Sequence, residues 1–156
     1  MQLPAKLDAA VIDSSALISI LMGEPAGVLF VRAFQMTGSL YIGTATRAET
    51  WLAAFNAKGL AGAQLVEELL VSLQVQTVDF THSSLQYFVY GGERYHHKVN
   101  AKSKLNLGDL YTYSTVQEMG LPLFYQGADF LNTPIQSAMK LLGYGVSEKG
   151  EPVVMN

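Results

Sequence analysis

The chain has 156 residues, a length that suits one domain, and 49% of them are hydrophobic, which is enough to form a full core. Cysteine is absent, which excludes disulfides, thiolate zinc sites and cysteine nucleophiles. The net charge of −3 argues against a generally basic nucleic-acid-binding surface, although a cluster of metal-binding acids would itself lower the net charge.

Residues 1–8 are expected to be a short lead-in, ahead of a domain over 9–142 and a C-terminal tail over 143–156 that has no clear pattern. The start of the chain does not resemble a secretory signal, and no apolar run reaches the roughly 18 residues that span a bilayer. We therefore expect a cytoplasmic protein with no membrane partner.

Hydrophobic periodicity and turn residues predict strands that alternate with helices. The first half of the chain has a strand over 9–12, a helix capped by Ser14 or Ser15 that stops near Gly23, a helix over 27–36, a strand over 40–42, a helix capped by Thr44 or Thr46 that ends before Gly59, and a helix over 62–73. The second half has a strand over 75–80, a helix over 82–95 that Gly91–Gly92 would interrupt, a helix over 107–119 capped by Asn106, a strand over 121–125 and a helix over 133–142. This alternation predicts a single α/β domain with a mostly parallel central sheet flanked by helices.

Acidic residues stand at the edges of apolar or tightly turning segments, at Asp13, Glu49, Asp109 and Asp129. Asp13 and Asp129 come after predicted strands, and ligands of parallel sheets bind beyond the carboxyl ends of the strands. A desolvated carboxylate is costly unless it is paired or bound to a metal, and converging carboxylates repel one another unless a cation holds them. One shared site for a divalent ion such as Mg²⁺ accounts for all four acids and suits hydrolysis of a phosphodiester.

Each acid also has an ordinary explanation when it is taken alone. Asp13 suits a helix cap, and Asp129 suits a turn. Asp109 can complete a capping arrangement with Asn106, and Glu49 suits an exposed position on a helix. The sequence leaves these alternatives open.

Other chemistries fit less well. The Asp-x-Asp that begins an aspartyl-phosphate phosphatase is broken by Ser15, and there is no phosphate loop of the P-loop kind. The histidines do not have the spacing of zinc ligands.

A basic stretch precedes the predicted helix over 107–119. Its members are Arg94, His96, His97, Lys98, Lys102 and Lys104. Clustered cations of this kind contact the phosphates of a nucleic acid, so the stretch is a candidate for contacts with a phosphate backbone. A solvated loop that is merely basic explains the same residues.

The four acids lie in short sequence motifs that follow one another along the chain. They are Val-Ile-Asp-Ser-Ser-Ala-Leu over 11–17, Thr-Arg-Ala-Glu over 46–49, Leu-Asn-Leu-Gly-Asp over 105–109 and Leu-Pro-Leu-Phe-Tyr-Gln-Gly-Ala-Asp-Phe over 121–130. In order and spacing the chain resembles the PIN-domain ribonucleases, and within them the VapC toxins of bacterial toxin–antitoxin pairs. It departs from this subgroup at Ala128, where an Asn is common.

The resemblance implies a PIN-like fold whose metal site is carried by Asp13, Glu49, Asp109 and Asp129. Asp13 and Asp109 would be the main direct ligands, while Glu49 and Asp129 would hold the metal or its waters. Ser15 would support Asp13, and Asn106 would lie beside Asp109 as a supporting amide.

The resemblance further implies an endoribonuclease toxin that depends on Mg²⁺ or Mn²⁺, cuts a cellular RNA and is neutralised by a cognate antitoxin. An Arg or Lys of the antitoxin would pair with the carboxylates in place of the metal. Members of the family are usually homodimers, and the apolar helices near the N-terminus suit such an interface. The alternatives are a catalytically silent PIN-like module that binds RNA or acts as a scaffold, and an unrelated metal-dependent phosphatase.

Overall fold

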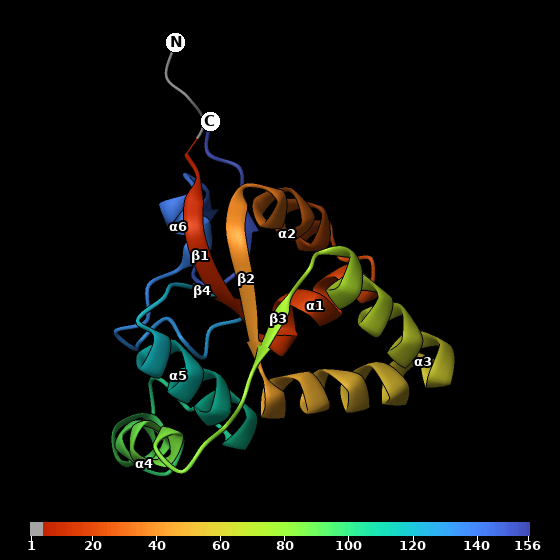
Figure 1. The fold of residues 1–156 in the computed structure, drawn as a ribbon. Helices are drawn as coiled ribbons and strands as arrows, with labels where there is room; N and C mark the ends of the chain where they lie inside the picture. The colour runs from red at the N-terminus through yellow and green to blue at the C-terminus, as the bar shows by residue number, and fades with distance from the viewer. Residues whose placement is uncertain (1–4) are drawn as a thin grey trace.

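A parallel sheet lies at the centre of the computed structural model, which describes residues 5–156 (Figure 1). Its strands are β1 (Leu7–Ile12), β2 (Thr37–Gly43), β3 (Gln76–Val78) and β4 (Leu123–Phe124), in the spatial order β3-β2-β1-β4. Each neighbouring pair is parallel, which confirms the predicted sheet. Because β1 lies between β2 and β4, the segments that follow these three strands meet at one edge of the sheet.

Helices cover both faces of this sheet. They are α1 (Ser14–Leu21), α2 (Pro25–Gln35), α3 (Thr44–Ser72), α4 (Ser84–Tyr95), α5 (Leu107–Met119) and α6 (Ala138–Leu141). Alternate residues of β1 point to opposite layers. Ala10 and Ile12 pack with α1, α2, α3 and α6, whereas Val11 packs with α5, and α4 lies on the outer side of α5 (Figure 1).

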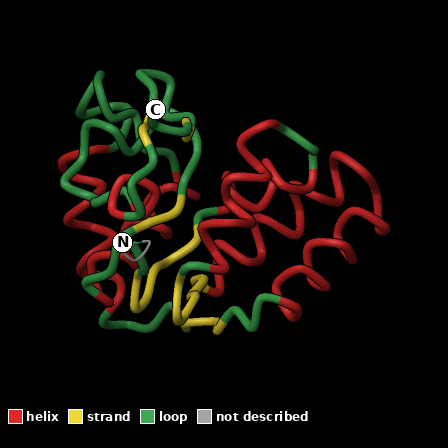
Figure 2. Tube along the Cα trace, turned by 90° about the horizontal axis from the view of Figure 1, so that it is seen from above, coloured by secondary structure: helices red, strands yellow, loops and turns green. Residues whose placement is uncertain are grey.

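The two helices expected on either side of Gly59 form one long bent element, α3. Lys58 and Gly59 leave the helical conformation inside it, and Gly59 has a φ of 65°, which glycine adopts without steric cost. The two arms of α3 turn back on each other at this point, and they project from the rest of the domain (Figures 1 and 2).

The serines and threonines predicted to cap α1 and α3 lie inside these helices, because the residue before each helix takes the cap position, which for Asp13 is the capping role that the sequence left open. Asp13, rather than Ser14 or Ser15, caps α1, and Gly43, rather than Thr44 or Thr46, occupies the cap position of α3. Asn106 caps α5 as predicted. The glycine pair over 91–92 does not interrupt α4, because Gly91 is buried against the ring of Tyr113.

The C-terminal part of the chain differs most from the prediction. The helix expected over 133–142 is reduced to α6, which begins after Ser137, whose side chain accepts a hydrogen bond from the backbone N–H of Lys140. The tail forms an antiparallel hairpin of β5 (Gly145–Val146) and β6 (Pro152–Val153). Residues 1–4 of the expected lead-in lie outside the described residues, β1 already begins at Leu7, and the domain limits of 9 and 142 stay a prediction.

Within residues 5–156, no single helix is long and apolar enough to cross a membrane. Within the same residues, α1 and α2 meet the combined test of length and composition when they are taken together, and the two are bent by 119° relative to each other.

Candidate active site

The four acids predicted from the sequence meet beyond the carboxyl ends of β1, β2 and β4. Asp13 directly follows β1, Glu49 lies in the first turns of α3 after β2, Asp109 lies in the first turn of α5, and Asp129 lies in the loop after β4. Burial, with the charges of Asp13, Asp129 and Glu49, raises the pKa of Asp109 to about 7, although the backbone hydrogen bond from Asn106 lowers it. The four carboxylates therefore share one electrostatic environment.

Asp13 is the most buried of these acids, at 3% exposure, and both of its carboxylate oxygens accept hydrogen bonds. Oδ2 accepts from the Ser15 hydroxyl at 2.6 Å and from the Ser15 backbone N–H at 3.1 Å. Oδ1 accepts from the hydroxyl of Thr112 at 2.6 Å. These bonds satisfy a buried carboxylate and fix its direction, which is the supporting role expected of Ser15.

Thr112 was missed by the sequence reasoning, although a signal for it exists. It lies on α5 three positions after Asp109, and residues three apart share one face of a helix. The face that presents the third acid therefore also presents the hydroxyl that holds the first. Thr112 Oγ1 also lies 3.1 Å from Thr46 Oγ1, which joins the start of α3 to the same network.

Asp109 and Asn106 form a capping box at the start of α5. The Asn106 side chain accepts from the backbone N–H of Asp109 at 2.9 Å, and the Asp109 carboxylate accepts from the backbone N–H of Asn106 at 3.1 Å. The two sequence interpretations, helix cap and member of the acid cluster, therefore both apply to Asp109.

Glu49 reaches the cluster through a space that a glycine leaves open. A Cβ at Gly108 would overlap the carboxylate of Glu49, so any larger residue at 108 would displace it. A cavity of about 300 Å³ opens here, lined by Ala45, Glu49, Asn106, Leu107, Gly108 and Tyr111. Partial desolvation of the carboxyl group and the charge of Asp13 raise the pKa of Glu49.

Asp129 is exposed and lies near one residue of the basic stretch. Partial desolvation and the charge of Asp13 raise its pKa, whereas the charge of Lys104 lowers it. Lys104 itself has a φ of 56°, and its loop is held by Asn100, whose side chain accepts from the backbone N–H groups of Lys102 and Ser103. Lys104 therefore faces the acid cluster from a well-ordered loop.

Other members of the basic stretch do not join this cluster. The guanidinium of Arg94 lies 3.5 Å from the ring centre of Tyr90, on the surface of α4. The rings of His96 and His97 lie against each other at a tilt of 42°, with centroids 4.0 Å apart, and Lys98 and Lys102 are exposed on the loop.

The donor set fits a hard divalent ion that keeps part of its water shell. The available donors are carboxylate oxygens, which Mg²⁺ and Mn²⁺ prefer. Among residues 5–156, no three acidic or histidine side chains stand close enough to enclose one ion. This arrangement suits Mg²⁺, which is usually bound through one or two carboxylates and several waters.

The PIN domain family model matches residues 10–136. The chain belongs to the PIN domain family. Among curated proteins it is similar to Ribonuclease VapC42 of Mycobacterium tuberculosis, with 27% identity over 130 residues that cover 82% of this chain and 98% of the relative. It is also similar to Ribonuclease VapC30 of the same organism, with 31% identity over 127 residues that cover 80% and 95% of the two chains.

Solved structures share the PIN fold at low identity. Mycobacterium tuberculosis VapC20, a toxin that cleaves the sarcin–ricin loop, has a TM-score of 0.67 at 13% identity and covers 81% of this chain and 95% of its own. VapBC2 from Rickettsia felis, bound to a DNA fragment from its promoter, has a TM-score of 0.64 at 13% identity, with 83% and 96% covered. The predicted PIN domain of VapC type is confirmed, and residues 137–156 lie outside the family match.

Proposed function

We propose that this PIN-domain protein is a toxin of VapC type: an endoribonuclease that depends on Mg²⁺ or Mn²⁺, hydrolyses phosphodiester bonds of RNA and is neutralised by a cognate antitoxin. The observation that carries the proposal is the meeting of four carboxylates at the carboxyl edge of the sheet. The similarity to VapC ribonucleases and to VapBC complexes supports it.

Asp13 and Asp109 would be the direct ligands of the ion, and Glu49 and Asp129 would hold the ion or its waters. A bound divalent ion would supply activation of an attacking water and compensation of charge on the leaving oxygen. Around it, the hydroxyls of Ser15 and Thr112 keep Asp13 in one orientation. Asn106 holds Asp109 through its capping bonds, and Asp109 must lose its proton to act as a ligand.

RNA would approach over the loop that carries Lys104. Its ammonium group lies near Asp129, so it would contact a phosphate beside the acids, and Lys98 and Lys102 would contact phosphates further along the strand. Arg94, which lies over Tyr90, would contribute least.

The antitoxin would place an Arg or Lys among the carboxylates, where a charge-assisted pair replaces the metal. We also propose that the protein acts as a homodimer in the cytoplasm, where its RNA substrate is found.

Cleavage of a structured RNA mixture, with Mg²⁺, with Mn²⁺ and with EDTA, tests the proposal. Asp13→Asn removes a charge but little volume, so we expect at least about a 100-fold loss of cleavage with the fold kept. Asp8→Asn is the matched control, because Asp8 is an exposed acid of β1 outside the cluster.

Cleavage that survives EDTA or Asp13→Asn would overturn the proposal. Binding of RNA without cutting, by folded protein free of antitoxin, would instead favour the silent RNA-binding module. Release of phosphate from small phosphomonoesters would favour the phosphatase.

A further inference from the structure

The C-terminal hairpin, formed by β5 and β6, has several hydrogen bonds in its turn and lies outside the family match. Its turn is closed around Ser147, whose side-chain oxygen accepts from the backbone N–H groups of Lys149 and Glu151. The backbone of Ser147 adds two more bonds, donating to the Glu151 carbonyl at 2.9 Å and accepting from the Gly150 N–H at 2.9 Å. These hydrogen bonds fix the backbone of residues 147–151.

The tip of this hairpin touches the backbone that leads to Asp129. The N–H of Gly127 donates to the carbonyl of Gly150 at 3.1 Å. Gly150 is buried with a φ of 75°, and a Cβ at this position would overlap the carbonyl group of Gly127. Two backbones are in direct contact here, an approach that only glycine at 150 permits.

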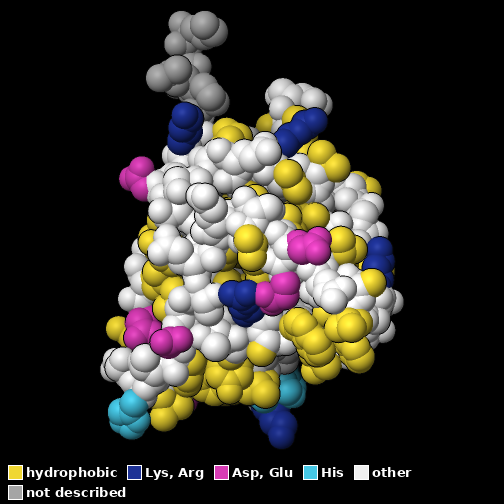
Figure 3. Space-filling model, turned by 45° about the vertical axis from the view of Figure 1, so that its right-hand side comes forward, with side chains coloured by type: hydrophobic (Ala, Val, Ile, Leu, Met, Phe, Trp, Pro, Cys, Tyr) yellow, Lys and Arg dark blue, Asp and Glu magenta, His cyan; other side chains and the backbone are white. Residues whose placement is uncertain are grey.

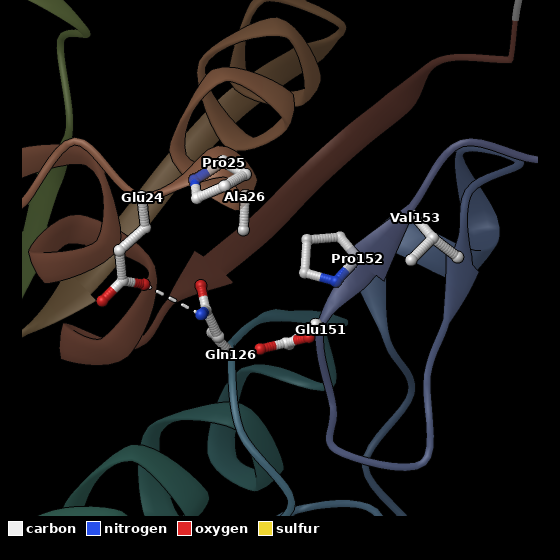
Figure 4. Close-up of a pocket in the computed structure, with 7 residues that line it drawn as sticks. All are labelled: Glu24, Pro25, Ala26, Gln126, Glu151, Pro152 and Val153. Atoms are coloured by element: carbon white, nitrogen blue, oxygen red, sulfur yellow. Dashed lines mark hydrogen bonds between the residues drawn. The ribbon is translucent and has the colours of Figure 1, made fainter.

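The residue before Gly127 joins this contact to the first acid. The backbone N–H of Gln126 donates at 2.9 Å to Ser15 Oγ, which in turn donates to Asp13 Oδ2. The side chain of Gln126 donates to Glu24 at 2.9 Å, and Figure 4 shows it between the start of α2 and Glu151 of the hairpin. A cavity of about 390 Å³ separates Pro25 and Ala26 from the hairpin strand at this place.

These contacts hold the N-terminal side of the loop that carries Asp129. Asp129 stands two residues after Gly127, in an exposed stretch, and Gly127 has a φ of 105° that leaves its backbone with wide freedom. On its C-terminal side the loop is held by Phe130, which is buried against the ring of Tyr125. On its N-terminal side it is held by hydrogen bonds. The bonds at Gln126 and Gly127 come from α1, from the residue before α2 and from the hairpin.

We propose that the C-terminal hairpin is a positioning element of the active site, which holds Gly127 through Gly150 and so sets the place of Asp129 relative to Asp13. The role of Asp129 rests on the proposed function, whereas the contact between hairpin and loop does not. Loss of the contact should weaken metal binding and leave RNA binding unchanged, because Lys104 lies on a different loop.

The test compares Gly150→Ala with Gly143→Ala. Both positions have a positive φ, 75° and 92°, so both substitutions strain the backbone. A Cβ at Gly143 meets nothing within 4 Å, whereas one at Gly150 meets Gly127. The measurements are hydrogen exchange over residues 125–131, Mn²⁺ affinity by electron paramagnetic resonance, RNA affinity in EDTA, and cleavage as a function of Mn²⁺ concentration.

For Gly150→Ala we expect faster exchange over 125–131, about tenfold weaker Mn²⁺ binding, unchanged RNA affinity and recovery of cleavage at high Mn²⁺. Ser147→Ala, which loosens the turn without touching Gly127, should shift the same quantities less, and it provides the test if Gly150→Ala does not fold. Exchange and Mn²⁺ affinity that stay at wild-type values, or that change equally in Gly143→Ala, would overturn the positioning role. Wild-type protein that neither binds Mn²⁺ nor cuts RNA would overturn the proposed function itself, while the exchange data would still decide whether the hairpin holds the loop.

Discussion

At the residue scale, Asp109 combines a folding role with a chemical one. Its carboxylate completes the capping box of α5, which stabilises a helix start. The same group is half-buried, and this partial burial together with the charges of three other acids raises its pKa to about 7. Ionisation of this carboxyl group is less favourable in the folded protein than in the unfolded chain. The free energy of unfolding therefore depends on pH.

The metal-free protein should become less stable as pH rises from about 4 to 7. The folded-state pKa of Asp109 is about 7, against an ordinary value of 3.8, so the folded state binds the extra proton in this window and stability is lost as that proton leaves. Urea unfolding in EDTA at pH 5 and pH 8 should differ by on the order of 2–3 kcal/mol in wild type and by clearly less in Asp109→Asn. If the free energy of unfolding changes equally with pH in wild type and in Asp109→Asn, Asp109 is not the group that causes the change.

Gly108→Ala should separate stability from activity. Alanine favours a helix by up to about 1 kcal/mol over glycine, and the Glu49 carboxylate ends a flexible side chain that can move aside, so the free energy of unfolding should not fall. The displaced carboxylate should reduce cleavage by roughly 10- to 100-fold.

Gly92→Ala is the control for this substitution, because it lies in helix α4 and its Cβ would meet only a Leu110 methyl, at 3.8 Å. Full activity of Gly108→Ala would mean that Glu49 is not required in its present position.

At the scale of the elements, α4 shows why a glycine pair need not break a helix. Gly91 lies where the ring of Tyr113 on α5 approaches most closely, so the missing side chain allows α4 and α5 to pack. Helix–helix contacts of this kind outweigh the conformational cost of glycine.

Gly91→Ala should destabilise the protein by about 1–3 kcal/mol, because its Cβ would lie 2.5 Å from the Tyr113 ring. Gly92→Ala should instead be neutral or stabilising by up to about 1 kcal/mol. Guanidinium unfolding of both variants measures these changes in stability. If Gly92→Ala were the more destabilising of the two, the close contact with Tyr113 would not be at Gly91.

The strands and helices ahead of residue 125 could be predicted from apolar periodicity together with cap and turn residues, such as Asn106 and Gly120 at the ends of α5. The helix expected over 133–142 is mostly irregular, and the hairpin after it has strands of only two residues, too short to show alternation. At the site, the four acids were predictable. Ser15 and Asn106 were predictable too, because each bonds an acid only two or three positions away in the sequence. Thr112 bonds Asp13 from 99 positions away. Its spacing from Asp109 places it on the face of the acids, but that spacing does not say which acid its hydroxyl would bind.

At the scale of the whole molecule, the chain is slightly acidic but has a local cluster of lysines. The net charge is −3, yet the loop before α5 carries Lys98, Lys102 and Lys104. Figure 3 shows few charged side chains on one face, among apolar and neutral ones, with a basic and an acidic side chain in contact near its centre. RNA attraction should therefore depend on the loop more than on the general surface.

Lys104→Ala should weaken RNA binding, and it should do so more at low salt than at high salt. Each lost phosphate contact reduces the slope of log affinity against log salt concentration by about 0.7 for single strands. Lys6→Ala, at an exposed position ahead of β1, should leave both affinity and slope unchanged. RNA titrations in EDTA at several salt concentrations measure the affinity and its slope. An equal slope for Lys104→Ala and wild type would show that Lys104 does not contact a phosphate of the RNA.

Both ends of the described chain lie at the end of the domain where β1 begins (Figure 1). The acids lie at the opposite end of the same strand, beyond Ile12. Fluorescent reporters or affinity handles fused to either terminus should therefore leave the carboxylate edge free. Protein tethered to a sensor surface through its ends would present that edge to the solution, which makes direct binding measurements with RNA or with an antitoxin peptide practical.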